Sequence, residues 1–307
     1  GFESRAHQLI IKISSAWSFL VPEILQIDED KLQSFIETND NLKRYEFDLK
    51  LINEKRPHIL DAEQEKLLTE AQDALSTPSN VYGMFSNADL EFEDAVDKDG
   101  EKHPLTQGTF IKYLESDDRE LRQSAYNNLY KAYGAYNNTL GSTLAGEVKK
   151  NVFNARTHNY KTARERALSN NHIPEEVYDN LVKTVHKYLP LLHRYTKLRK
   201  ELLDVDELKM YDLYTPMVKD VKFEMPYEEA KEWMLKALEP MGKEYLDVVK
   251  EGLNNRWVDV YENKGKRSGG YSSGAHLTNP FILLNWSDTV SDLYTLCLLY
   301  TSDAADE

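Results

Sequence analysis

Apolar residues recur every three or four positions along most of the chain, and this spacing predicts amphipathic α-helices. The pattern is clearest in residues 28–56, 117–156 and 174–202. The middle series predicts one long helical stretch, with apolar positions at Leu121, Ala125, Leu129, Tyr133, Tyr136, Leu140, Leu144, Val148 and Val152. The last series contains Pro190, where we expect a kink because proline cannot donate a helical hydrogen bond. The chain is therefore predicted to be mainly α.

Local signals mark the ends of two helices. Asp61 and Gln64 have the spacing of a capping box, in which two residues satisfy each other's free backbone N–H groups. Ser287 is placed to cap a last helix that begins immediately after it. Residues 210–223 contain aromatic and β-branched residues without helical spacing, so this stretch is expected to be extended.

Two strands are predicted near the end of the chain, over residues 257–262 and 281–286. Four glycines lie between them, and glycine lets another chain approach closely. An exposed edge at residues 281–286 would offer N–H and C=O groups to an extended peptide, and the helix after it could present ligands to that peptide. The same residues fit a core hairpin with one more packed helix, because short apolar runs are usually core. Spacing alone leaves both interpretations open.

Composition limits the classes of partner. The net charge of −14 argues against nucleic acid and against an anionic membrane, because both favour surplus Lys and Arg. Cys297 is the single cysteine, which excludes a disulfide framework and favours a reducing compartment, so a cytoplasmic location is expected. No stretch has the roughly 18–20 consecutive apolar residues of a membrane helix.

Several blocks of the sequence together resemble a known enzyme family. Late in the chain they are KRSGGYSSG (266–274), TNPFILLNW (278–286) and DLYTL (292–296). Earlier blocks include NADLEFEDAVDKDGEKHPLT (87–106) and LESDDRELRQSAYNNLYKAY (114–133). These blocks resemble oligoendopeptidase F, which belongs with the thimet-oligopeptidase-like zinc metallopeptidases, over nearly the whole chain up to Leu296.

The resemblance implies a helical N-terminal domain (residues 1–115) that leads into the first part of a helical catalytic domain (residues 116–296), with a small β-sheet near residues 257–286. It implies hydrolysis of peptide bonds in short oligopeptides by a zinc-activated water. In the family, DLYTL is followed after one residue by H-E-x-x-H, whose histidines bind zinc and whose Glu is the general base. Zinc is therefore expected in the intact parent protein, with oligopeptides as partners.

The sequence departs from this pattern at the metal site itself. Leu298, Leu299 and Ser302 occupy the positions of His, Glu and His. We therefore expect this chain to hold no zinc, to lack catalytic residues and to be inactive. Residues 297–307, CLLYTSDAADE, read like a translated sequencing adaptor and are expected to be a non-native tail that does not continue the helix. On this interpretation the catalytic domain is incomplete and the chain is a fragment.

Substrate-positioning residues are accordingly the only site residues predicted in this chain. They lie in the glycine-rich segment and the strand after it: Gly269, Gly270, Tyr271, His276, Phe281, Ile282, Leu283, Asn285 and Trp286. His186 and His193 share a helix face but have no third ligand beside them, so we interpret them as surface residues. The competing class is a non-catalytic helical protein that binds peptides or acts as a scaffold. A native sequence that continues into H-E-x-x-H would favour the peptidase.

Overall fold

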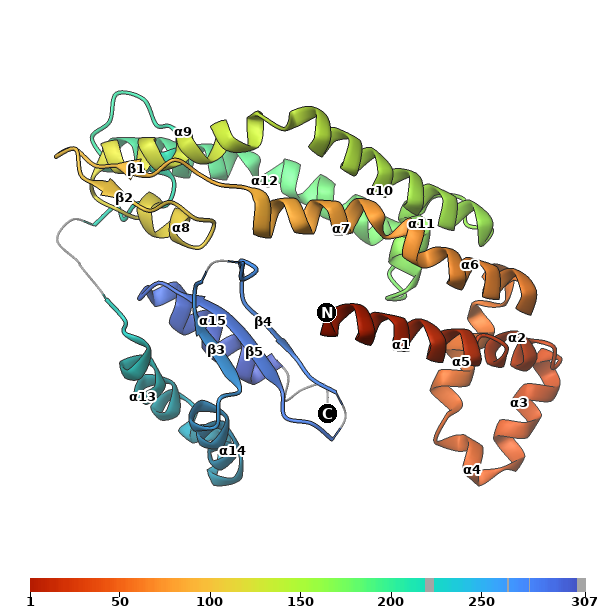
Figure 1. Cartoon of the computed structure of the whole chain (residues 1–307). Helices are drawn as coiled ribbons and strands as arrows, with labels where there is room; N and C mark the ends of the chain where they lie inside the picture. Colours follow the sequence, from red (N-terminus) through yellow and green to blue (C-terminus); the bar gives the residue numbers. More distant parts are fainter. Residues whose placement is uncertain (219–223, 264, 276, 303–307) are drawn as a thin grey trace. The chain divides into compact units, whose positions relative to one another are not determined.

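The computed structural model describes residues 1–218, 224–263, 265–275 and 277–302 (Figure 1). The chain is mainly helical, as predicted, with two small β-sheets. In chain order the elements are α1 (Phe2–Trp17), α2 (Leu20–Leu25), α3 (Glu29–Thr38), α4 (Asp40–Lys43), α5 (Glu46–Glu54), η1 (Arg56–His58), α6 (Ala62–Leu75), α7 (Thr77–Met84), η2 (Phe85–Asp89), β1 (Ala95–Val96), β2 (Lys102–His103), α8 (Thr109–Leu114), α9 (Arg119–Gly134), α10 (Asn137–Thr157), α11 (Ala163–Ser169), α12 (Glu175–Leu202), η3 (Met210–Asp212), α13 (Tyr227–Ala237), η4 (Glu239–Met241), α14 (Lys243–Asn254), β3 (Val258–Tyr261), β4 (Tyr271–Ser273), β5 (Phe281–Trp286) and α15 (Val290–Ser302).

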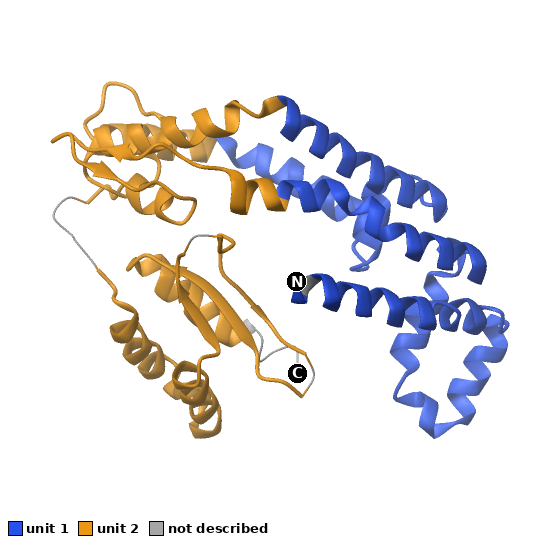
Figure 2. Ribbon diagram, viewed as in Figure 1, with its two compact units in different colours: residues 1–82, 138–189 blue, residues 83–137, 190–307 orange. Residues whose placement is uncertain are grey.

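Two compact units are formed, and each contains two separate stretches of chain (Figure 2). Unit 1 comprises residues 1–82 and 138–189, and unit 2 comprises residues 83–137 and 190–307. The chain therefore passes between the units three times, inside α7, at the start of α10 and inside α12. The domain boundary near residue 115 was derived from family resemblance and stays a prediction.

In unit 1, side-chain caps fix the starts of helices α3, α4, α6 and α11. Helix α1 packs on α6, and α2 packs on α5. The Asp61 side chain accepts a hydrogen bond from the Gln64 backbone N–H at 2.9 Å, which confirms that half of the predicted capping box. The return hydrogen bond is made by Glu65 rather than by Gln64: the Glu65 carboxylate accepts from the backbone N–H of Leu60 at 2.9 Å.

One segment of unit 1, Ser4–Leu25, is helical, long and apolar enough to cross a membrane by length and composition. It covers most of α1 and all of α2 and contains the charged residues Arg5, Lys12 and Glu23, so it is not an uninterrupted apolar run. A signal sequence near an N-terminus and a core helix meet the same criterion. The segment by itself therefore does not assign a membrane span.

The first half of unit 2 packs a β-hairpin and α8 against α9. Its core consists of Ala95, Leu105, Leu121, Ala125 and Leu129. The single long helix predicted over residues 117–156 is wrong, because α9 ends at Gly134 and α10 begins at Asn137. Glycine commonly ends helices, and here it separates the buried apolar positions of α9 from α10 positions that are largely exposed, including Leu144 and Val148.

Helix α12 continues through Pro190 as one element of 28 residues. The stretch after it was predicted to be extended, but Met210–Asp212 forms a 3₁₀ turn. Residues 219–223 of that stretch lie outside the described part of the chain. A helical turn forms at residues 210–212 because Asp212 caps it, accepting a hydrogen bond from the backbone N–H of Lys209 at 2.9 Å.

The second half of unit 2 is a three-stranded sheet covered on one face by helices. The strand order is β3-β5-β4, with β3 parallel and β4 antiparallel to β5. Strands β3 and β5 were predicted, whereas β4 was not. Side chains alternate along β5, and one face carries the buried residues Ile282, Leu284 and Trp286. That inner face packs with residues of α13, α14 and α15 in one hydrophobic core.

Candidate functional site

The outer strands of the three-stranded sheet are β3 and β4, and β5 lies between them. Among the strands that the structure describes, β5 is central and is paired on both sides. The prediction that residues 281–286 form an exposed edge is therefore wrong. The reason is topological: the chain enters β4 before β5, and β5 then inserts between the two earlier strands, which no local pattern reveals.

The hydrogen-bond register shows which backbone groups β4 leaves unpaired. The N–H of Ile282 donates to the C=O of Trp257, beside β3, at 2.8 Å. Backbone groups of successive strand residues point in opposite directions, so Phe281 and Leu283 direct theirs toward β4. Their partners are Ser273 and Tyr271. Ser272, between them, consequently directs its N–H and C=O away from the sheet.

Two predicted glycines shape this edge in different ways. Gly269 has a φ of +96°, a left-handed conformation that favours glycine. A Cβ on Gly270 would lie 3.0 Å from Cγ2 of Thr295, on α15. Gly270 therefore lets the start of β4 lie close to α15. This close packing, rather than space for a peptide, is what the structure assigns to Gly270.

Asn285 closes the glycine-rich segment onto the sheet. Its Nδ2 donates to the C=O of Arg267 at 3.0 Å and to the C=O of Gly269 at 2.8 Å. Its Oδ1 is buried and has no hydrogen-bond partner among the described residues. Asn285 thus holds the segment that precedes the β4 edge.

The remaining predicted site residues divide between the two faces of the sheet. Phe281 and Leu283 lie on the outer face together with Tyr271. Ile282 and Trp286 lie on the inner face in the core, where the Trp286 indole donates to the C=O of Met225 at 3.1 Å. Their side chains therefore cannot contact a ligand on the outer face. His276 lies outside the described residues.

Helix α15 carries the positions at which the family resemblance places the metal ligands. The helix begins at Val290 rather than after Ser287, because Asp292 accepts hydrogen bonds from the backbone N–H groups of both Ser287 and Thr289. It continues to Ser302, so the expectation that residues from Cys297 onward do not continue the helix is wrong. Leu298 is 62% exposed, one turn beyond the contact between Thr295 and Gly270. The expected ligand position thus faces solvent near the start of β4.

A second group of metal-binding residue types occurs in the β1–β2 hairpin. Carboxylate and imidazole atoms of Asp97, Glu101 and His103 lie within 4.8 Å of one another. Asp97 already accepts from the backbone N–H groups of Asp99 and Glu101 and from the His103 ring at 2.8 Å. The hydrogen bond with His103 is the main cause that lowers the pKa of Asp97. These contacts stabilise the hairpin turn, and we interpret the group as structural.

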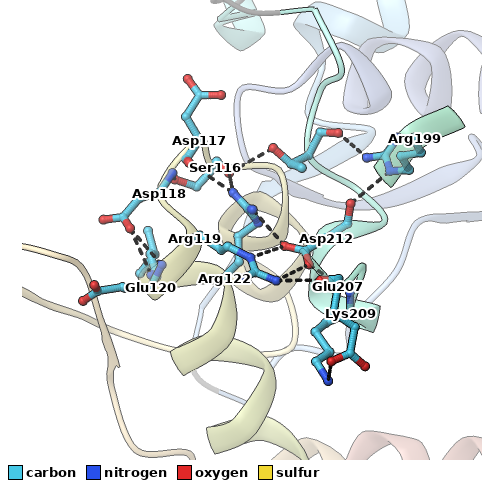
Figure 3. A network of polar contacts seen from close by, with 12 residues as sticks. Ser116, Asp117, Asp118, Arg119, Glu120, Arg122, Arg199, Glu207, Lys209 and Asp212 are labelled. Atoms are coloured by element: carbon cyan, nitrogen blue, oxygen red, sulfur yellow. Dashed lines mark hydrogen bonds and ion pairs between the residues drawn. The ribbon is translucent and has the colours of Figure 1, made fainter. Parts of the chain in front are cut away.

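The densest buried charge cluster surrounds Asp212 (Figure 3). Its carboxylate is fully buried and accepts hydrogen bonds from Arg119 and Arg122 at 2.9–3.1 Å. Arg199 holds the same turn from α12 by donating to the C=O of Asp212 at 2.9 Å. Burial alone would raise the pKa of Asp212, but the hydrogen bonds from the two arginines hold the pKa below its usual range. An anion paired in this way is a poor base, so the cluster is structural.

A pocket lined by residues of all three strands was missed by sequence reasoning. Its volume is about 390 Å³, and it is lined by Arg256, Trp257, Val258, Asp259, Tyr271, Phe281, Ile282 and Leu283. Tyr271 and Phe281 were predicted as site residues, but Trp257 and Asp259 were not. Period-two alternation in residues 257–261 was the available signal, and it could be used only once the strand order was known.

Comparison with known proteins identifies the family. Residues 112–303 match the model of peptidase family M3, and residues 23–92 match that of oligopeptidase F. Oligopeptidase PepF of Bacillus subtilis is 54% identical over 296 residues, which are 96% of this chain and 44% of that protein. Group B oligopeptidase PepB of Streptococcus agalactiae is 43% identical over 96% of this chain and 49% of its own length.

A solved structure agrees with the sequence matches. The crystal structure of oligoendopeptidase-F from Enterococcus faecium has a TM-score of 0.68 and 43% identity, and the match covers 82% of this chain and 47% of that chain. This chain spans about half the length of the curated relatives that it matches. The family model covers more than half of the residues, and so the chain belongs to peptidase family M3.

Proposed function

We propose that this chain forms the peptide-holding part of an oligopeptide-cleaving metallopeptidase. The observation that carries the proposal is the unpaired edge of β4, where Ser272 directs both backbone groups outward. An extended peptide can pair with such an edge as an additional strand, since main-chain hydrogen bonds supply affinity without requiring one sequence. Gly269, Gly270 and Asn285 would act by holding this edge in place, and Tyr271, Phe281 and Leu283 by contacting the peptide.

The residues at the expected metal positions do not fit zinc. Zinc is bound by Cys, His, Asp or Glu, whereas Leu298 and Leu299 have hydrocarbon side chains. No hydrolytic step is therefore derived for this chain. These two leucines also favour the second candidate function, which is peptide binding without cleavage. Zinc-dependent hydrolysis is proposed for the whole parent protein, by analogy with the oligopeptidases that the chain resembles.

The test measures binding and cleavage separately on the 307-residue chain. A fluorescent heptapeptide is titrated and followed by anisotropy, alongside the same peptide with three consecutive N-methylated residues. We expect binding of the first peptide and at least about tenfold weaker binding of the second, because N-methylation removes the N–H donors that strand pairing needs. Equal affinity for both peptides would contradict edge pairing.

Cleavage is measured with an internally quenched form of the same peptide, with and without added zinc, beside the Bacillus subtilis relative as a positive control. We expect no hydrolysis by this chain. Zinc-dependent hydrolysis would show that residues other than those at positions 298, 299 and 302 hold a metal. Oligopeptides are thus the proposed partners, and the cytoplasm remains the proposed location on the basis of the single cysteine.

A further inference from the structure

We propose that the outer face of the β3-β5-β4 sheet selects apolar side chains of the bound peptide, with Tyr271 and Phe281 as the specificity-determining residues. This inference rests on the proposed function, since it requires a peptide paired with β4. It adds which residues of the peptide are recognised, by what chemistry, and in which orientation the peptide lies.

The first step follows from the register of the sheet. Asp259, Leu283 and Tyr271 lie side by side across the three strands, because Leu283 is paired with Asp259 on β3 and with Tyr271 on β4. A peptide on the free edge of β4 extends this row by one residue. Side chains of directly opposite residues lie on the same face, with Cβ atoms about 4.5–5.5 Å apart. One peptide side chain must therefore lie beside Tyr271.

The orientation of the backbone determines which peptide residue this is. Ser272 is the residue whose backbone groups point outward, so the peptide residue opposite Ser272 makes both hydrogen bonds in an antiparallel pair. That residue shares the inner face with Ser272. The residues before and after it lie opposite Ser273 and Tyr271 and direct their side chains to the outer face. Antiparallel pairing is proposed because it is the arrangement of β4 with β5 and is slightly more stable per residue.

The outer face offers an apolar surface at this place. Tyr271 is 44% exposed and Phe281 is 65% exposed, although the opposite face of the same sheet is part of the core. Together with Leu283 and Trp257 they line the 390 Å³ pocket, which is at the small end of the range of about 300–1,000 Å³ for ligand pockets. A pocket of this size suits one large side chain rather than a whole peptide.

The polar groups of the pocket set a further preference. Arg256 and Asp259 also line it, so the apolar floor has charged groups of both signs around it. Trp257 is only 9% exposed, and its Nε1 has no hydrogen-bond partner among the described residues. An aromatic or large aliphatic side chain would cover Tyr271 and Phe281, whereas a carboxylate there would lose hydration and face the carboxylate of Asp259 as well as Arg256.

The test uses peptides in which N-methylation fixes the orientation. A heptapeptide methylated on alternate residues can pair with β4 only through its unmethylated residues. In the antiparallel arrangement, the side chains of the methylated residues then lie on the outer face. We expect a central methylated Phe or Leu to bind at least about tenfold more tightly than a methylated Asp, because burying a large apolar side chain is strongly favourable. The same replacement at an unmethylated residue should have a smaller effect.

Variants of the chain provide the second arm. Tyr271→Ala should remove most of the preference for Phe over Asp, and Tyr271→Phe should retain it. Tyr261→Ala is the matched control, because Tyr261 is an exposed tyrosine on β3 that does not line the pocket. The peptide series on the unchanged chain needs no variant to fold.

The outcomes separate the two proposals. Binding without any preference for apolar side chains would overturn this inference and leave edge pairing intact. A preference confined to unmethylated residues would overturn the proposed combination, because in an antiparallel pair those side chains lie on the inner face. Absence of binding by every peptide at millimolar concentration would overturn the proposed function and this inference together.

Discussion

Asp212 links parts of unit 2 that are distant in the sequence. Its two arginine partners lie at the start of α9, and Arg199 on α12 fixes the same turn through its backbone (Figure 3). A fully buried carboxylate is destabilising unless it is ion-paired and hydrogen-bonded. The carboxylate of Asp212 is both. Removing the negative charge would leave Arg122, itself buried, without its partner.

The first prediction is that Asp212→Asn destabilises the protein by about 3–5 kcal/mol, the usual cost of breaking a buried ion pair. Urea unfolding followed by far-UV circular dichroism measures this. Asp206→Asn is the matched control, because Asp206 is exposed and six residues away. A loss below 1 kcal/mol, similar to that of the control, would contradict the structural role of the cluster.

The pH dependence of this effect has a defined sign. The pKa of Asp212 is lowered in the folded protein, so the carboxylate contributes stability above its unfolded pKa of about 3.9. That contribution is lost as the pH falls through the folded pKa. The unchanged chain should therefore lose stability below about pH 4 more steeply than Asp212→Asn, when urea midpoints are compared from pH 6 to pH 3. Parallel slopes would show that the carboxylate does not titrate in this way.

The place of individual residues in the sheet was predictable from motif position, but the direction of their side chains was not. Tyr271 and Phe281 were placed correctly in the region of the sheet, and the structure adds that both reach the outer face. Ile282 and Trp286 belong to the same strand, yet their side chains lie in the core. Which face is buried depends on the helices packed against it, and those contacts are non-local. Alternation along the strand alone does not show which of its two faces lies in the core.

At the scale of elements, helices were easier to predict than the sheet. Strand β5 was predicted with its exact bounds, because FILLNW is a compact apolar run between turn residues. Strand β4 has only the residues Tyr-Ser-Ser and carries almost no local signal. Gly134 did indicate the break between α9 and α10. The prediction followed the continuous apolar series instead.

Two glycines in helices should respond oppositely to alanine. Gly252 in α14 packs against Trp257 and Tyr300, and an added Cβ would lie 2.6 Å from the indole and 2.8 Å from the phenol oxygen. Gly141 in α10 has open space around it. Gly252→Ala should lower the free energy of unfolding by about 1–3 kcal/mol, because the added methyl group overpacks the core. Gly141→Ala should raise the free energy of unfolding by as much as about 1 kcal/mol, because alanine has the higher helix propensity.

Thermal or urea unfolding of the two glycine variants measures the difference. Since the substitution is the same in both helices, the comparison isolates packing from propensity. Stabilisation by Gly252→Ala would mean that α14 is not packed closely against the aromatic pair.

Helix α15 allows a direct test of why zinc does not fit. Positions 298 and 302 lie one turn apart in a continuous helix, which is the spacing with which two histidines bind one metal ion. The double variant Leu298→His/Ser302→His should bind cobalt(II), a spectroscopic substitute for zinc, at least about tenfold more tightly than Leu298→His alone. Visible absorption titration gives the affinity. Equal affinities would mean that the two positions do not share a helix face.

At the scale of the whole molecule, the longest described helix, α12, leaves most of its apolar side chains exposed. Eleven large apolar residues along it are between two-fifths and three-fifths exposed, and Arg199 is the single buried residue among its described positions. Apolar faces of this size are unusual in monomeric soluble proteins. The sequence predicted the apolar series correctly, but periodicity cannot show whether a partner is present in the folded chain.

This exposure predicts dye binding by the folded chain. The chain should enhance the fluorescence of 8-anilinonaphthalene-1-sulfonate several-fold over an ordinary globular protein of similar size. Leu181→Lys/Val185→Lys should reduce the enhancement, because both side chains are among the most exposed on α12. Lys183→Gln, between them, is the matched control. No enhancement would contradict the exposed state of this helix.

The threefold passage of the backbone between the two units also constrains how the protein is made. Residues 1–82 are synthesised before any of unit 2, but unit 1 lacks its second stretch until residue 189 has been translated. By then residues 83–137 have already emerged, although unit 2 still awaits everything from residue 190 onward. Domains usually fold as units in the order of synthesis. Here both units are instead incomplete until residue 189 has been translated, so unit 1 cannot finish folding before part of unit 2 has been made.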